Sequence, residues 1–230
     1  TAIGTGVNAH KDFGKVFASE VSKLTKLNVK TSTNYFKSLS AQDSAAQLSS
    51  SVKNRSLVLT KISNDLRWMN SGPISGLSEI TLKPLQPGSS IMPGKINPVI
   101  PEAVLMAMAQ VSGNHNAINI ACISGSFQLN TMLPLIALNI INSFNLLINS
   151  VYSIADTIDT FTINESVIKS NLERNPIIAT KLNEVIGYDL ASKIVKEAYK
   201  SNRSIVDITQ EMTDLSEAQI IKLLDPKKLI

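Results

Sequence analysis

The sequence predicts an all-α protein in which a bundle of long helices is followed by a small C-terminal helical domain. Two very long segments repeat apolar residues at intervals of three and four with almost no proline or glycine, as helices do. No stretch of useful length alternates apolar and polar residues with the period of a strand. The 230 residues, 43% of them apolar, are enough to bury a substantial core.

Two helices are expected in the first 70 residues. The first runs from His10 to about Leu27, and the second is a single long helix from residue 34 or 35 to Asn70. It ends at Ser71-Gly72-Pro73, since a glycine after the last turn and a proline beyond it are typical of helix ends. The apolar face of the first helix consists of Val16, Phe17, Val21, Leu24 and Leu27.

Two more long helices are expected after a connector at residues 74–87. The third begins near Pro98 and Pro101, because the first helical position tolerates a residue without an N–H, and it runs to about Ala121. Gly113 and Asn114 mark the place where this helix would bend. After a break at residues 124–126, the fourth helix runs from 128 to 156.

The fourth helix is apolar nearly all round, with one narrow polar stripe of asparagines. A lipid-facing helix would not carry that stripe, so we expect no membrane span. A helix that is apolar on most faces is buried on most faces, and a chain of this length cannot surround it alone. We therefore expect a homo-oligomer whose other subunits cover it. The stripe consists of Asn139, Asn142, Asn145 and Asn149.

The pattern changes near residue 160, which places the domains at 1–160 and 161–230. The second domain reads as five short helices, at 165–172, 176–186, 189–200, 204–212 and 216–224. Ser216 and Gln219 have the spacing of a capping box, with glutamine in place of glutamate.

Composition excludes several classes of protein. The net charge of +4 is mild and the lysines are scattered, so we expect no nucleic-acid partner. Cys122 is the single cysteine, which rules out an intrachain disulfide and favours a cytoplasmic setting. The N-terminus lacks the basic and apolar regions of a signal peptide. It also lacks methionine, and we expect the sequence to start inside a longer chain.

The segment GSSIMPGKINP at residues 88–98 is the strongest candidate for a functional site. Two glycines and two prolines cannot continue a helix, so it is a loop between helices. The hydroxyls of Ser89 and Ser90, the Lys95 ammonium, the Asn97 amide and unshielded backbone N–H groups can together hold a carboxylate. The simpler interpretation is a surface connection rich in turn-forming residues.

Removal of a proton from a carbon next to a carboxylate needs such donors, because the intermediate carries a second negative charge on that carboxylate. Ser89 could be the base only if N–H donors and exclusion of water made its hydroxyl acidic. His10 and His115 are far apart in the sequence, and no cluster has the spacing of metal ligands. We expect neither a metal nor an organic cofactor.

The loop resembles GSSxMPxKxN, the signature of the fumarase/aspartase superfamily. Further blocks resemble the superfamily in the same order: TAIGTGVN at 1–8, NDLRW at 64–68, SGP at 71–73 and LN at 129–130. NYFKSL at 34–39, NDLRW and GYD at 187–189 are most similar to class II fumarate hydratase. The resemblance covers the whole chain and corresponds to the C-terminal half of a family member.

The resemblance implies a role for each residue of the loop. Ser89 would take the C3 proton of malate, and Glu102 would pair with a catalytic histidine that handles water. Neither His10 nor His115 matches that histidine, so the chain alone is expected to be inactive. The family forms homotetramers with a shared core of long helices and sites built from three subunits. The residues implied to hold the fumarate or malate dicarboxylate are Ser90, Lys95, Ile96 and Asn97.

Two alternatives stay open. NPVIPE at 97–102 and QLN at 128–130 resemble aspartate ammonia-lyase, which uses the same carbanion chemistry with ammonia as the leaving group. The second alternative is not an enzyme: the chain would serve only as a non-catalytic helical assembly module. NDLRW, near the end of the long second helix, is interpreted as structural.

Overall fold

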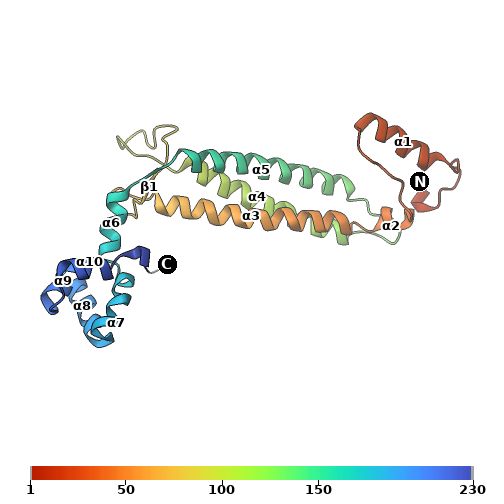
Figure 1. The fold of residues 1–230 in the computed structure, drawn as a ribbon. Helices are drawn as coiled ribbons and strands as arrows, with labels where there is room; N and C mark the ends of the chain where they lie inside the picture. Colours follow the sequence, from red (N-terminus) through yellow and green to blue (C-terminus); the bar gives the residue numbers. More distant parts are fainter. Residues whose placement is uncertain (1, 229–230) are drawn as a thin grey trace. The chain divides into compact units, whose positions relative to one another are not determined.

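The computed structural model describes residues 2–228, and helices dominate it (Figure 1). The expected all-α class is confirmed. The chain forms two compact units: a bundle unit, Thr1–Trp68 and Leu82–Phe161, and a C-terminal unit, Met69–Thr81 and Thr162–Ile230. Residues 69–81 thus group with the later part of the chain, while the domain boundary at 160 stays a prediction. Thr1, part of the first sequence block, lies outside the described residues.

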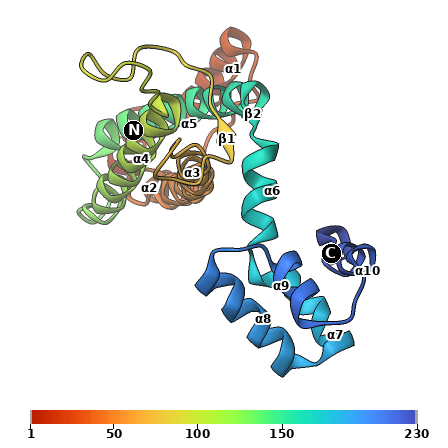
Figure 2. The ribbon, with the colours of Figure 1, turned by 90° about the vertical axis from the view of Figure 1, so that its left-hand side faces the viewer.

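Three long helices make up the bundle unit. The helices α4 and α5 pack along their length, and α3 lies beside them; Figure 2 shows the group from its end. The loop before α4 lies at one end of the bundle, and α2 lies at the other (Figure 1). The helices of this unit are η1 (Ala2–Gly4), α1 (Phe13–Thr25), α2 (Tyr35–Ser40), α3 (Asp43–Met69), α4 (Val99–Ile123) and α5 (Leu133–Thr160).

The prediction of one continuous helix from residue 34 or 35 to Asn70 is wrong, because α2 and α3 are separated at residues 41–42. In a continuous helix the Leu39 carbonyl would accept from the N–H of Asp43. It accepts instead from the backbone N–H of Asn130, at 2.8 Å. Ala41 adopts an extended conformation, which ends α2. A contact from a distant part of the chain therefore interrupts a locally consistent helical pattern.

The predicted start of the last long helix at Gln128 is also wrong. Ser126 and Leu129 exchange two backbone hydrogen bonds, of 2.9 and 3.1 Å, and form a tight turn. Asn130 is 1% exposed, and its side-chain oxygen accepts from the N–H of Met132 at 2.8 Å, so α5 begins only at Leu133. The helix α4 runs without interruption through Gly113.

The buried face of α3 repeats every seven residues, with a small serine and an aliphatic residue in each repeat. Small residues let neighbouring helices approach closely, and the aliphatic ones fill the remaining space. Between the helices lie polar contacts: the Ser49 hydroxyl is 2.8 Å from His115 Nδ1, and the Asn114 amide donates to Ser143 at 3.1 Å. The buried residues of α3 are Ser49, Val52, Ser56, Leu59, Ser63 and Leu66.

Much of the apolar surface of the bundle unit stays exposed. Phe17 and Leu24, on the predicted apolar face of α1, are 60% and 83% exposed. By length and composition alone, α5 could cross a membrane, and it is the one helix of the described residues that could. Its asparagine stripe is the feature that a lipid-facing helix would not carry.

Buried apolar residues of the C-terminal unit form one cluster. Figure 2 shows the short helices that make up this unit. Two short antiparallel strands, β1 (Ile80–Thr81) and β2 (Thr162–Ile163), join residues 69–81 to the rest of this unit. The Ser216–Gln219 capping box is confirmed. The helices are α6 (Glu165–Glu173), η2 (Pro176–Leu182), α7 (Asn183–Ile186), α8 (Tyr188–Ser201), α9 (Ile205–Met212), α10 (Glu217–Leu223) and η3 (Pro226–Lys228).

Candidate active-site loop

Residues 82–98 form an irregular loop that leads directly into α4, as predicted. Val99 is the first helical residue and Pro98 the residue before it, so the missing N–H of proline falls where no helical partner is needed. Glu102 lies in the first turn, is half-buried and has its N–H bonded to the Pro98 carbonyl at 3.0 Å. A carboxylate there is stabilised by the positive end of the helix dipole.

Hydrogen bonds at Gly88 close the base of the loop. The Gly88 N–H donates to the Lys95 carbonyl at 3.0 Å, and the Asn97 side-chain amide donates to the Gly88 carbonyl at 2.8 Å. Residues 89–95 therefore form a loop whose two ends are joined by hydrogen bonds. Through the bond from its side-chain amide, Asn97 contacts Gly88, the residue directly before Ser89.

The Ser89 hydroxyl oxygen accepts two backbone hydrogen bonds. The donors are the N–H groups of Ile91, at 3.1 Å, and Met92, at 3.2 Å. Donors aimed at an oxygen favour negative charge on it, which is what a serine that acts as a base requires. The backbone of the loop thus supplies two of the N–H donors that would make the Ser89 hydroxyl more acidic.

The other predicted ligands of the carboxylate lie on the exposed side of the loop. Ser90, Lys95 and Ile96 are all exposed. Within residues 2–228, no ion pair occupies the Lys95 ammonium. These groups therefore face solvent in this chain.

Neither histidine pairs with Glu102 in the described part of the chain. His115 lies between Ser49 and Asn119, with ring nitrogens 2.8 and 3.0 Å from their side chains. His10 is exposed, and its Nδ1 lies 3.9 Å from Asp12. The histidine that Glu102 is predicted to orient is therefore neither of these two.

Two cavities of the bundle unit lie at different places relative to the predicted site. One of about 110 Å³ lies at the base of the loop, where Asn97 and Pro98 meet Ser153 and Asp156 of α5. The other, of about 520 Å³, is lined by α1 and residues 29–39 and contains none of the predicted site residues. Neither cavity encloses Ser89. Among residues 2–228, no group of three His, Cys, Asp or Glu side chains is placed to hold a metal.

The sequence did not reveal the hydrogen bonds at Gly88. A glycine before two serines is compatible with any turn, and only the fold shows that its two peptide groups meet residues 95 and 97. The LN block had a different outcome. Its Asn130 is buried and donates to the Ala121 carbonyl at 2.9 Å, which makes it a structural residue of this unit.

Two family models match this chain, one in its first half and one near its C-terminus. Residues 1–113 match the lyase family model, and residues 178–230 match the model for the C-terminus of fumarase C. The class II fumarate hydratase 2 of Pseudomonas aeruginosa is 50% identical over 230 residues, which are 100% of this chain and 50% of the relative. The chain spans about half the length of the curated relatives it matches.

Solved structures agree with this assignment. A fumarate lyase:delta crystallin from Brucella melitensis has a TM-score of 0.90 and 36% identity, over 100% of this chain and 50% of that one. A class II fumarase from Schistosoma mansoni has a TM-score of 0.87 and 32% identity, over 100% and 51%. The chain is therefore similar over its whole length to class II fumarate hydratases and corresponds to about half of each.

Proposed function

We propose that this chain provides the proton-abstracting part of a fumarate hydratase, which reversibly adds water to fumarate to give (S)-malate. The observation that carries the proposal is the Ser89 hydroxyl, which accepts two N–H groups in a loop that also presents Lys95 and Asn97. Relatives that are 38–50% identical and bear the name class II fumarate hydratase support it.

In the malate-to-fumarate direction, ionised Ser89 takes a proton from C3. The electron pair left on C3 moves into the neighbouring carboxylate, which becomes an aci-carboxylate with two negative charges. The pair then forms the C2–C3 double bond as the C2 hydroxyl leaves, and that hydroxyl takes up a proton to leave as water. Donors already placed at the carboxylate stabilise the intermediate without reorganisation. The proposed donors are Ser90, Lys95, Asn97 and the backbone N–H of Ile96.

Glu102 is proposed to orient the histidine that handles the water. Its position in the first turn of α4, the helix that directly follows the loop, supports this role. His10 and His115 are committed elsewhere, so the histidine belongs to a surface that these 230 residues do not supply. We accordingly expect the 230-residue chain to be inactive alone.

The assembly is proposed to be a homo-oligomer, a tetramer, with each site built from more than one subunit. The apolar surface left open on α4 and α5, including Met106, Ile123 and Tyr152, supports this. Neither of the two cavities described above includes Ser89 in its lining, which supports it too. A cytoplasmic location and the absence of nucleic-acid and membrane partners remain predictions.

Aspartate ammonia-lyase is the second candidate. It is favoured by the sequence NPVIPE, which runs from the loop into α4 and includes Asn97 and Glu102. The carbanion chemistry would be the same, so the loop geometry fits both reactions. A non-catalytic assembly role would leave the loop without a use.

A chimera separates these functions. In it, the 230 residues replace the matching half of the Pseudomonas aeruginosa relative, which is 50% identical. We expect it to convert malate to fumarate, followed by ultraviolet absorbance, and to release no ammonia from aspartate. Ammonia release without malate dehydration would transfer the assignment to the second candidate. A folded, oligomeric chimera with neither activity would support the assembly role.

A further inference from the structure

Gly88, which neither the proposed mechanism nor the substrate contacts use, bonds through both of its polar backbone groups. Its N–H donates to the Lys95 carbonyl at 3.0 Å, and its carbonyl accepts from the Asn97 amide at 2.8 Å. The residue immediately before the proposed base is therefore tied to two of the proposed substrate ligands. One residue sets the separation between the two ends of the loop.

Only glycine fits at this position. A Cβ on residue 88 would lie 2.4 Å from the Lys95 carbonyl oxygen, 2.8 Å from its carbonyl carbon and 3.2 Å from the Asn97 nitrogen. These neighbours are backbone atoms, which cannot turn aside as the end of a flexible side chain does. Any side chain would push residues 95–97 away and lengthen both hydrogen bonds.

The bond to Gly88 also fixes the Asn97 amide. An asparagine amide has two N–H groups, and its terminal torsion is broad when nothing restrains it. One N–H is donated to the Gly88 carbonyl, which sets the plane of the amide. Within residues 2–228, the second N–H has no partner, so it is free to donate to a ligand carboxylate.

We infer that Gly88 is a positioning residue of this site. It holds the Asn97 amide in the orientation that presents its second N–H to the substrate carboxylate, and it fixes Asn97 relative to Ser89. Gly88 itself touches no substrate. This role rests on the proposed function, because it assumes that Ser89 and Asn97 act on one dicarboxylate.

The test is a double-mutant cycle in the chimera with Gly88→Ala, Asn97→Ala and both together. Because misplacement of about 1 Å can cost a hundredfold in rate, Gly88→Ala should lower kcat/KM by about ten- to a hundredfold although Asn97 is intact. If Gly88 acts through Asn97, the double variant should be no worse than the worse single variant. The inference would be overturned if the double variant lost kcat/KM by the product of the two single losses. It would also be overturned if Gly88→Ala kept kcat/KM within about twofold of wild type.

Gly113→Ala is the matched control. Gly113 lies within α4, and the nearest atom to its added Cβ is Gln110 Nε2, at 4.0 Å. The substitution is the same, but nothing is displaced. Activity should not change, so a loss caused by Gly88→Ala cannot be a general effect of replacing a glycine.

Hydrogen exchange gives a readout that does not depend on activity. The N–H groups of Gly88, Ile91 and Met92 are bonded within the loop, and Asn97→Ala should make all three exchange faster. Unchanged exchange would overturn the role of Asn97 at the loop base even in an active chimera. If the wild-type chimera has no activity, the proposed function fails, while the exchange rates still decide whether Gly88 and Asn97 hold the loop.

Discussion

The two units bury their apolar residues to different extents. In the C-terminal unit, Leu182, Ile194 and Ile220 are fully buried, and short helices surround them on all sides. In the bundle unit, buried residues form narrow lines along long helices, while Met106 and Tyr152 remain about 70% exposed. One unit has a buried apolar core of its own, and the other leaves large apolar side chains exposed along its helices.

Helix length explains the contrast. A helix of 7–14 residues can turn its one apolar stripe inward within a small cluster, as α8 to α10 do. The helix α5 has 28 residues and is apolar on several faces, so two neighbouring helices cover only part of it.

The largest effect is expected inside the closed core. Ile194→Ala in the full chain removes a side chain with no exposed surface, and it should lower the free energy of unfolding of the C-terminal unit by about 2–5 kcal/mol. Ile221→Ala makes the same change at a position that is 55% exposed, and it should cost much less. Denaturant unfolding of both variants measures the difference. Equal losses would mean that this core is not closed as described.

The next effect is on association. Ile141→Lys places a charge on the exposed apolar surface of α5 and should weaken self-association at least about a hundredfold if other subunits cover it. Ile221→Lys is the control, because Ile221 is similarly exposed but lies on the C-terminal unit. Light scattering after size exclusion gives the mass of each. A wild-type chain that is monomeric would contradict the proposed assembly.

A smaller effect is expected from the polar contact between α4 and α5. Asn114 is 5% exposed, donates to Ser143 and accepts from Gln110 at 2.8 Å. Asn114→Ala leaves the buried Ser143 hydroxyl without its partner and should cost about 1–3 kcal/mol of bundle stability. Asn116→Ala, on the exposed side of the same helix, should cost nothing and can even favour the helix. Thermal unfolding of the two variants compares them.

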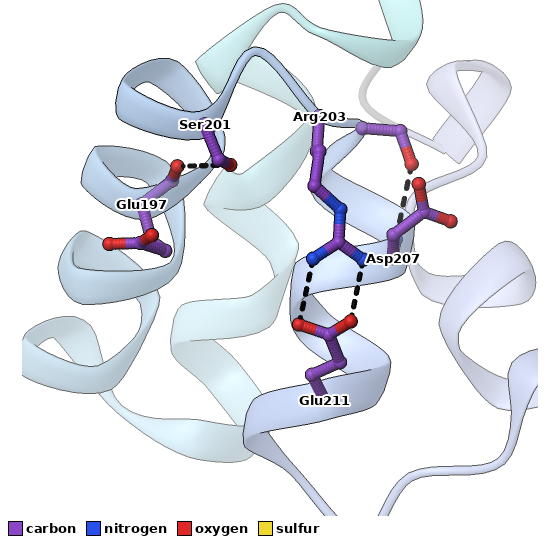
Figure 3. A network of polar contacts seen from close by, with 6 residues as sticks. Glu197, Ser201, Arg203, Asp207 and Glu211 are labelled. Carbon is purple, nitrogen blue, oxygen red and sulfur yellow. Dashed lines mark hydrogen bonds and ion pairs between the residues drawn. The ribbon is translucent and has the colours of Figure 1, made fainter.

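The smallest effect is expected at the surface of the C-terminal unit. Arg203 donates to both carboxylate oxygens of Glu211, at 2.6 and 3.0 Å (Figure 3). The hydrogen bond from Arg203 lowers the pKa of Glu211 below its ordinary value of 4.5. The stability that this ion pair adds to the folded state is therefore fully present above the pKa of Glu211 in the unfolded state. It is lost as the pH falls through the lower pKa that Glu211 has in the folded state.

Glu211→Gln removes that titration. Unfolding of the C-terminal unit, followed from neutral pH to below 4, should lose less stability on acidification in the variant than in the wild type. Because both side chains are exposed, the difference should be small and should shrink further in high salt. Identical pH profiles would mean that the pair contributes nothing measurable.

The sequence predicted the elements whose causes are local. The helix α3 ends at Met69, shortly before Gly72 and Pro73. Ser216 and Gln219 cap α10, and Pro98 precedes α4, each through the chemistry of its own neighbours. The break at residues 41–42 escaped prediction because its cause, the N–H of Asn130, lies about ninety residues away in the sequence.

The same distinction holds for the site. The combination of Ser89, Lys95 and Asn97 was recognisable because the required chemical groups are adjacent in the sequence. The role of Gly88 was not, since it depends on how close the backbone of residues 95–97 comes. His115 shows the reverse case, in which a residue with catalytic potential is used to join α3 and α4.

The most direct test of the account is the rate of malate dehydration by Ser89→Ala in the chimera, with mass and helicity measured on the same sample. The account predicts that kcat falls by about 10²–10⁴-fold, as for loss of a general base, while the oligomer and the fold are unchanged. A kcat within about twofold of the parent chimera would contradict it, because the base would then not be Ser89.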